Sequence, residues 1–411
     1  MSVQQIETPT QPEAGQPNGG SPLNWAKWIQ RLKQGDLGML PVIAALILIW
    51  LFFYSQFPVF LSPRNLSFLL LQITVLGVLA VGVVLVLLLG EIDLSAAAAA
   101  GVCAAIMAVL LSRYHWGIVP AVAAGLVAAV VIGLGQSFFV AVVGVPSFVV
   151  TLAGLLALQG IMLFVLGEQG TVNVNDEALL RLASTYLPPT VGWVLLLASA
   201  AGYLFVVVRR RQRRAAAGLA LKSIWSQIAQ SVAVFVVGAL AVWRLNQYMG
   251  VPLAGLVLLA IIGAWSIVLK HTTFGRNVYS VGGNAEAARR SGINVVRVRM
   301  SVMALATLMF AVAGVIGASR FASVSYNAFA GGSLLLEAIG AAVIGGTSLF
   351  GGRGRIASAL VGALVIGTLS NGLNLYSASS ATKYVVTGAI LLAAVTIDAL
   401  SRKRRAASGT A

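Results

Sequence analysis

The chain has 411 residues, of which 59% are hydrophobic and only 9% are charged, and its mean hydropathy is +0.94. A soluble domain of this length would carry many more charges, so a soluble fold is excluded. The formal net charge of +16 would suit a nucleic-acid-binding protein, but the basic residues lie between and beyond the apolar stretches. The composition therefore predicts an all-α polytopic transmembrane bundle with no nucleic-acid partner.

Three regions are expected along the chain. Residues 1–35 are predicted to form a disordered or interfacial cytoplasmic tail, because they begin as a polar segment rich in Gln, Pro and Gly without signal-peptide features. Residues 36–402 are predicted to form the transmembrane domain, and residues 403–411 a basic cytoplasmic tail.

Apolar runs close to the roughly 20 residues needed to cross a roughly 30 Å hydrocarbon layer are predicted spans. Twelve such runs follow one another: 38–57, 67–89, 94–111, 117–143, 148–166, 190–208, 231–247, 250–269, 298–319, 334–350, 355–374 and 384–400. The run 67–111 is interrupted by Gly90–Ser95, and the run 117–143 is long and contains Gly133, Gly135 and Gln136. Either could be a broken or re-entrant helix. The predicted count is therefore ten to twelve.

Basic residues are distributed unevenly between alternate loops. If the N-terminus is cytoplasmic, 21 of the 27 Lys and Arg residues lie on the cytoplasmic side and six on the other side. The main cytoplasmic groups are the Arg209–Arg214 run, six residues between Lys270 and Arg299, and the Arg402–Arg405 cluster. Because cytoplasmic loops are enriched in Lys and Arg, both termini are predicted to be cytoplasmic.

The loop 270–299 combines charge with signals for ordered structure. Asn284 is a good N-cap, and Glu286 lies in the first turn, where the helix dipole favours a carboxylate. Gly292 can end a helix in the left-handed conformation. Residues 285–291 are therefore predicted to form a two-turn helix outside the bilayer, which could serve either as an ordered connection or as a docking element.

Few acidic residues lie near membrane depth. A carboxylate there costs several kcal/mol unless it is paired, protonated or hydrated, so Glu91, Asp93 and Glu337 are functional candidates. Asp93 could instead cap a helix beginning at Leu94. Glu337 lies within an apolar run, where a cap role is not expected.

Uncharged polar side chains within the spans could contact a polar solute. An uncharged polar solute would need amide and hydroxyl partners beside apolar or aromatic walls, and Gln72, Asn371 and Asn374 are the favoured candidates. Hydrogen bonding between helices explains such residues equally well.

Several motifs together resemble the permeases of the ribose/xylose branch of bacterial sugar ABC importers, most closely the D-xylose-type members. The resemblance covers nearly all of residues 60–400. The motifs are Leu61–Asn65, Glu91–Ser95, Val145–Phe148, Thr151–Gly154, Thr273–Arg276, Gly282–Asn284, Glu286–Ala288 with Gly292–Ile293, Gly345–Leu349, Gly351–Gly352 and Asn371–Gly372. Xylose-type members have an additional helical pair with an Arg-rich loop, here 190–247.

The resemblance implies a transport subunit of the bacterial inner membrane that works with a cytoplasmic ATP-binding subunit and a periplasmic sugar-binding protein. A homodimer is expected from the resemblance and because isologous dimers are common. The implied ATPase-coupling residues are Phe274, Gly275, Arg276, Asn284, Glu286, Ala287, Ala288, Arg289 and Gly292. The expected substrate-path residues are Gln72, Glu91, Asp93, Glu337, Asn371 and Asn374.

Other classes of function can be weighed against this interpretation. The chain has no Gly-Lys dipeptide and therefore no Walker A loop, so ATP hydrolysis would need a separate subunit. An ion-coupled secondary transporter is the main alternative, and it is disfavoured because the acids within the bundle have no evident basic partner. His115 and His271 are predicted on opposite faces, so no catalytic residues, metal site or cofactor are expected.

Overall fold

The computed structural model describes residues 40–219 and 224–407, so the predicted tail 1–35 lies outside the described residues. Of the predicted tail 403–411, residues up to Ala407 continue the last helix and the rest lie outside the description. The helices and strands, in chain order, are α2 (Leu40–Gln56), η1 (Pro58–Leu61, a 3-10 helix), α3 (Pro63–Leu88), α4 (Ala96–Ser112), α5 (Ile118–Phe138), η2 (Phe139–Val143, a π-helix), α6 (Ser147–Leu166), β1 (Thr171–Asn173), α7 (Glu177–Ser184), β2 (Tyr186–Leu187), α8 (Pro189–Ala216), α9 (Ile224–Asn246), β3 (Val251–Pro252), α10 (Leu253–His271), α11 (Thr273–Gly283), α12 (Ala285–Arg290), α13 (Val295–Phe321), β4 (Ser323–Ser325), α14 (Tyr326–Phe329), α15 (Leu334–Ile344), α16 (Ile356–Leu375) and α17 (Ser380–Ala407).

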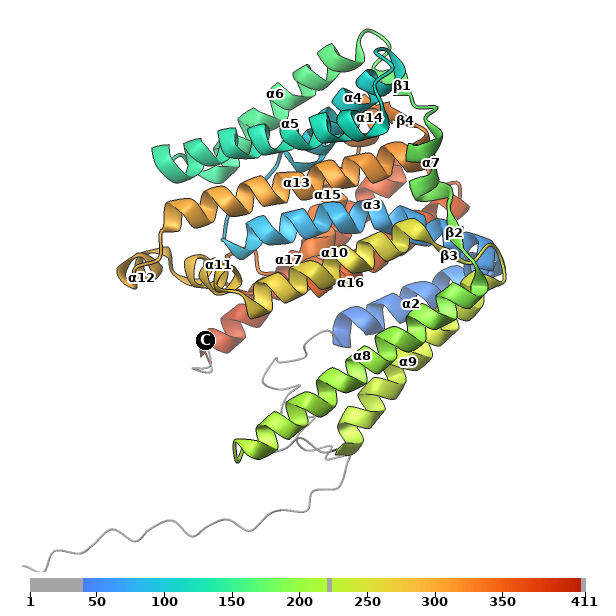
Figure 1. Ribbon diagram of the computed structural model, residues 1–411, viewed down its shortest axis with the longest axis vertical. Helices are drawn as coiled ribbons and strands as arrows, with labels where there is room; N and C mark the ends of the chain where they lie inside the picture. The colour runs from blue at the N-terminus through green and yellow to red at the C-terminus, as the bar shows by residue number, and fades with distance from the viewer. Residues whose placement is uncertain (1–39, 220–223, 408–411) are drawn as a thin grey trace, which may run out of the picture.

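The helical membrane protein expected from the sequence is confirmed. Within the described residues, nine helices are long and apolar enough to cross a membrane, and three shorter apolar helices accompany them. Each of the twelve predicted apolar runs coincides with a helix. The long helices lie roughly side by side, with α11 and α12 at one end of the bundle and α7 with the short strands at the opposite end (Figure 1).

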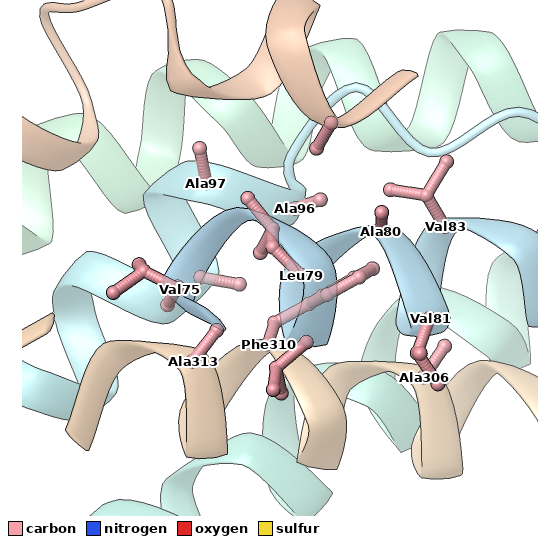
Figure 2. Close-up of a cluster of buried hydrophobic side chains, with 14 of the residues drawn as sticks. Val75, Leu79, Ala80, Val81, Val83, Ala96, Ala97, Ala306, Phe310 and Ala313 are labelled. Atoms are coloured by element: carbon pink, nitrogen blue, oxygen red, sulfur yellow. The ribbon is translucent and has the colours of Figure 1, made fainter. Parts of the chain in front are cut away.

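Helix α3 lies at the centre of the bundle, and 89% of its most apolar window is buried inside the protein. It packs against α13 and α16, and α4 contacts both α13 and α3. Figure 2 shows Leu79 of α3 beside Phe310 of α13, with the alanines of α4 closing the cluster. Gly82 permits this approach, because a Cβ there would lie 2.8 Å from the carbonyl oxygen of Ala306.

Helices α8 and α9 form a hairpin beside the main bundle, where the sequence predicts an additional pair within 190–247 (Figure 1). Only 6% of the most apolar window of each helix is buried in the protein. The hairpin is held at the strand end of the bundle, where β2 pairs with β3 and Asn246 donates to the carbonyl of Pro189. At the other end it diverges from α10 and α17 (Figure 1).

Two segments of the bundle are not helical for part of their length. Residues 90–95 have no helical structure, as the interruption in the run 67–111 suggested, and α4 begins only at Ala96. The predicted span 334–350 is too long, because α15 ends at Ile344. Gly345 there lies too close to the backbone of Ser358 for any side chain, and Gly346 has a positive φ of 97°.

Short strands connect the loops at the end of the bundle opposite α11 and α12. β1 pairs antiparallel with β4, so the segment after α6 is tied to the segment after α13. Helix α7 is capped by the Asp176 carboxylate, which accepts from the N–H of Leu179, and Ser319 of α13 accepts from the N–H of Ala183. These hydrogen bonds fix the loops at this end against the core helix α13.

Candidate coupling site

Helix α12 begins and ends at the signals found in the sequence. The side chain of Asn284 accepts a hydrogen bond of 2.9 Å from the N–H of Ala287, and Glu286 pairs with Arg290 at 3.2 Å. At the end, Gly292 has a φ of 85° and the N–H of Ile293 donates to the carbonyl of Ala288. The predicted helix 285–291 is thus confirmed, with its last residue one position earlier.

The two alanines of α12 face opposite ways. Ala287 is exposed, whereas Ala288 is only 4% exposed and belongs to the same buried cluster as Val281 and Val295. From the sequence, both alanines are predicted to contact a partner subunit. Only Ala287 is exposed enough for such a contact. Arg276, Glu286 and Arg289 are exposed at the same end of the protein.

Helix α11 precedes α12 and was not expected from the sequence. Its N-cap is Thr272, whose side chain accepts from the N–H of Gly275, and Gly275 lies so close to the backbone of Leu269 that no side chain would fit. Phe274, Val278 and Val281 follow one another at i, i+4 and i+7 and face the core. This periodicity, together with the cap, is the signal that could have revealed the helix.

Five glycines from three segments meet where α11 ends: Gly90, Gly282, Gly283, Gly351 and Gly352. We call this contact the glycine junction. A Cβ on Gly282 would overlap the carbonyl oxygen of Leu88, and one on Gly351 would lie 2.7 Å from the N–H nitrogen of Gly90. The N–H of Gly352 donates to the carbonyl of Leu88 at 2.9 Å. The end of α11 is therefore in direct backbone contact with the start of the 90–95 segment and with the loop that follows α15.

Tyr279 adds a second contact between α11 and that loop. Its hydroxyl donates to the carbonyl of Gly354 at 2.9 Å. Burial raises the pKa of Tyr279, partly opposed by the nearby charge of Arg355, so the hydroxyl stays protonated and remains a donor. A displacement of α11 would thus be transmitted to the loop 345–355 by a hydrogen bond as well as by packing.

Side chains of neighbouring helices form hydrogen bonds with the polar groups of the non-helical segment 90–95. Ser147 accepts from the N–H of Ile92, and Thr151 accepts from the N–H of Leu94 and donates to the carbonyl of Ile92. Gln136 donates to the hydroxyl of Ser95 at 2.9 Å. Irregular backbone is tolerated at membrane depth only where protein or water completes its hydrogen bonds, and Ser147 and Thr151 of α6 do so here.

Glu91 has a basic partner, contrary to what the sequence suggested for the acids of the bundle. Its Oε1 lies 3.1 Å from Nε of Arg299, with side-chain exposures of 13% and 28%. The contact is ionic and not a well-aligned hydrogen bond, since Nε of Arg299 lacks a hydrogen-bond partner within the described residues. Arg299 lies one turn into α13, directly after α12, so this pair is another link between the α12 region and the 90–95 segment.

The other expected path residues do not form one cluster. Asp93 is buried and accepts from the N–H and hydroxyl of Ser95, the residue just before α4 begins, so it shapes the turn before that helix. Glu337 accepts from Ser333 at 2.6 Å in the first turn of α15. It therefore lies beside the N-terminus of a helix, although the sequence analysis, which started this span at the same residue, expected no cap role for it.

The amides are used in different ways. Asn371 of α16 exchanges hydrogen bonds of 2.8 and 3.2 Å with Asn65 of α3, and this is the helix-to-helix alternative left open by the sequence. Asn374 is exposed and accepts from Lys383. Gln72 is half-buried on α3.

This architecture defines a class: a polytopic helical membrane protein with interrupted spans joined to an exposed capped helix at one end. The profile of the family described as the permease component of the branched-chain amino acid transport system matches residues 65–185 and 178–395. The chain belongs to this permease family.

Individual relatives agree with the family assignment. The chain is 37% identical over 374 residues to the xylose transport system permease protein of Escherichia coli (strain K12), covering 91% of this chain and 94% of the relative. It is 36% identical to the protein of the same name from Haemophilus influenzae, covering 91% and 99%. It is also 32% identical to the ribose import permease protein of Escherichia coli (strain K12), covering 83% and 87%. No solved structure matches the chain.

Proposed function

We propose that this chain is the transmembrane subunit of an ATP-driven importer that carries D-xylose into the bacterial cytoplasm, with ATP hydrolysed by a separate subunit. The observation that carries the proposal is the glycine junction, because it joins an exposed, capped helix to the interrupted segments of the membrane bundle. The identity with xylose permeases across nine-tenths of the chain supports both the transport class and the sugar.

The proposed coupling runs from α12 inward. A nucleotide-binding subunit docks on the exposed face of α12 around Ala287, and its movement displaces α11 and α12 together. Because Gly282 touches Leu88 and Gly352, this displacement moves the ends of both non-helical segments. The Glu91–Arg299 pair makes the start of α13 move with the segment 90–95. A pathway between these segments then opens toward one side or the other.

The orientation follows from charge. The basic groups at the ends of α8, α10 and α17 and in α12 lie toward the α11–α12 end, and Arg181, Arg244 and Arg320 lie near the strands. This end therefore faces the cytoplasm in our proposal, with both termini on that side and twelve membrane segments, of which α2, α4 and α15 are short. The membrane is the inner membrane, and the strand end receives sugar from a periplasmic binding protein.

The sugar path is proposed to run along the interrupted segments. Gln72, Asp93 and Glu337 are the side chains that we assign to it, and Glu91 lies at its cytoplasmic mouth. Asn374 lies at the opposite end of α16 and is assigned to the periplasmic entrance. The chain acts as a homodimer in this scheme, since isologous dimers are the commonest assembly.

The deciding experiment is reconstitution of the full chain in liposomes with its ATPase and binding protein. We expect ATP-dependent uptake of D-xylose, with ribose, arabinose and galactose transported more slowly. Uptake driven by a proton or sodium gradient without the ATPase would overturn the importer proposal in favour of a secondary transporter. Faster uptake of ribose would retain the importer and overturn only the choice of sugar.

A further inference from the structure

A third break lies inside one of the candidate membrane spans. The span Tyr326–Ile344 is long and apolar enough to cross a membrane, yet residues 330–333 are not helical and separate α14 from α15. Gln159 of α6 donates to the carbonyl of Ala330 at 3.1 Å, and Gln159 lies about 10 Å before the end of α6 at Leu166. The break therefore lies within the depth of the bundle, below its strand end.

The backbone of this break is only partly paired. The N–H groups of Gly332 and Ser333 have no acceptor in the part of the chain that the structure describes. Gly331 and Gly332 are exposed on the surface of the protein. Lipid cannot complete backbone hydrogen bonds, whereas water in a cavity can. The exposed side of the break is therefore expected to face water and not the acyl chains.

Polar side chains of α14 and α15 lie beside the break. Asn327 is exposed, and its amide makes no hydrogen bond within the described residues. A Cβ on Gly331 would lie 3.1 Å from Oδ1 of Asn327 and 3.1 Å from the ring atom Cε1 of Tyr326, so both side chains lie against the break. Ser333 donates to Oε1 of Glu337, which leaves the other carboxylate oxygen free to accept from a ligand.

These groups suit a neutral polyol better than an ion. A free amide offers a donor and an acceptor, a carboxylate oxygen accepts from a hydroxyl, and the ring of Tyr326 offers an apolar wall. Glu337 is the one carboxylate among these side chains, and a cation site would need several such oxygen ligands. An anion is disfavoured because none of these side chains is basic.

We propose that the break at 330–333 forms a sugar subsite in the half of the bundle nearest the strands. The amides of Gln159 and Asn327 bind hydroxyl groups of the sugar, Glu337 accepts from a further hydroxyl, and Tyr326 packs against the ring carbons. Ser333 holds the carboxylate in place. The choice of a sugar as the ligand rests on the proposed function, whereas the access of water to the break does not.

Thiol labelling of the full chain in lipid nanodiscs tests the access of water without transport. The chain has one cysteine, Cys103, and its 1% exposure keeps the background low. A permanently charged methanethiosulfonate reagent should modify Ser333→Cys at least about tenfold faster than Ile161→Cys, because only the ionised thiol reacts and lipid suppresses its ionisation. Ile161 is the matched control, since it is 44% exposed and lies at the depth of Gln159 on the other side of α6.

Asn327→Cys provides a second probe of water access, because it removes no hydrogen bond within the described residues. It should also be modified at least about tenfold faster than Ile161→Cys. Agreement between the two probes would show that the loss of the Ser333 contact with Glu337 does not itself open the break.

Protection by sugar tests the ligand. D-xylose should slow the modification of Ser333→Cys, and sucrose at the same concentration should not. Adding Asn327→Leu should raise the D-xylose concentration that gives half-protection about two- to tenfold, which is the effect of losing one hydrogen bond. The unfolding temperature should stay unchanged, because the Asn327 amide has no partner in the described chain.

Three results have different consequences. Modification of both probes no faster than that of Ile161→Cys would overturn the subsite, since lipid or a second copy would then cover the break. Rapid modification without protection by D-xylose, or with protection by sodium ions alone, would overturn the sugar assignment. Protection by D-xylose in a chain whose reconstituted complex shows no ATP-driven uptake would support the subsite and overturn the proposed function.

Discussion

Helices α3 and α8 are both long and apolar enough to cross a membrane, yet 89% of the apolar window of α3 is buried in the protein and 6% of that of α8. The difference lies in what their glycines meet. Gly77 and Gly82 of α3 face Leu258 and Phe310 at van der Waals distance or closer, whereas Gly202 of α8 has no atom within 4 Å in the described structure. Small residues that admit a neighbour therefore accompany the burial of α3, and hydropathy alone does not report it.

The sharpest test of that contrast places the same substitution in each region. Gly362 of α16 lies against the backbone of Ala341, and a Cβ there would overlap the carbonyl oxygen. Gly362→Val should lower the stability by an amount at or above the upper end of the roughly 1–3 kcal/mol that overpacking costs. Thermal unfolding in detergent, with the yield of monodisperse protein, measures the effect.

Gly202→Val on α8 is the matched control, because the same side chain enters open space. It should change the stability by no more than about 0.5 kcal/mol. If both valine variants unfold at the same temperature, close helix packing at Gly362 does not hold the bundle together.

A second contrast lies within α12. Ala288→Arg places a charge in the buried cluster without a partner and should destabilise the protein by several kcal/mol. Ala287→Arg enters solvent in the isolated chain and should leave the unfolding temperature unchanged. It should nevertheless lower ATP-dependent sugar uptake by about tenfold or more, since bulk at the centre of a docked interface costs over about 1.4 kcal/mol.

Uptake and binding of the ATPase are measured on the reconstituted complex, and unfolding on the chain alone. Ala287→Ser is the control, because it keeps a small side chain at the same exposed position. Wild-type uptake by Ala287→Arg would refute docking at this face of α12.

Local signals predicted local structure well. The twelve apolar runs, the cap of α12 at Asn284 and the interruption at 90–95 depend on residues close together in the sequence. Contacts across the bundle could not be predicted in this way. Arg299 reaches Glu91 from the start of α13, and Ala288 is buried by residues of α11 and α13, so neither the ion pair nor the burial has a sequence signal.

The predicted length of a helix was wrong where a glycine lies against the backbone of a residue distant in the sequence. The run 334–350 reads as a complete span, but Gly345 is pressed against Ser358 and the helix ends at Ile344. Sequence motifs from five places converge on the glycine junction and the segment 90–95. Their chemistry becomes clear only when Ser147 and Thr151 are seen to complete the backbone hydrogen bonds of Ile92 and Leu94.

The ion pairs of the two ends provide a third contrast. Glu91–Arg299 is largely buried, whereas Glu177–Arg181 on α7 has side-chain exposures of 81% and 68%. A double-mutant cycle with glutamine at positions 91 and 299 should give a coupling energy of about 1–2 kcal/mol, reduced from that of a fully buried pair by the remaining exposure.

The same cycle at positions 177 and 181 should give about 0.3–0.5 kcal/mol, as for an exposed i, i+4 pair. Chemical unfolding of each single and double variant provides the energies. A coupling at positions 91 and 299 no larger than that at 177 and 181 would mean that this pair does not bind the segment 90–95 to α13.

The smallest expected effect separates a helix contact from a sugar contact. Asn371 and Asn65 satisfy each other between α16 and α3, so Asn371→Leu should cost about 0.6 kcal/mol and at most about 1.7 kcal/mol. Asn65→Leu should cost more, because Asn65 also donates to the carbonyl of Phe60, and the double variant should cost little more than Asn65→Leu alone. Asn246→Leu in the hairpin removes a more exposed hydrogen bond to Pro189 and should cost less.

The KM for sugar should stay unchanged in the Asn371 variant if the pair serves helix packing alone. A raised KM at unchanged stability would instead assign Asn371 to the sugar path, since a residue that only joins two helices does not contact the transported solute.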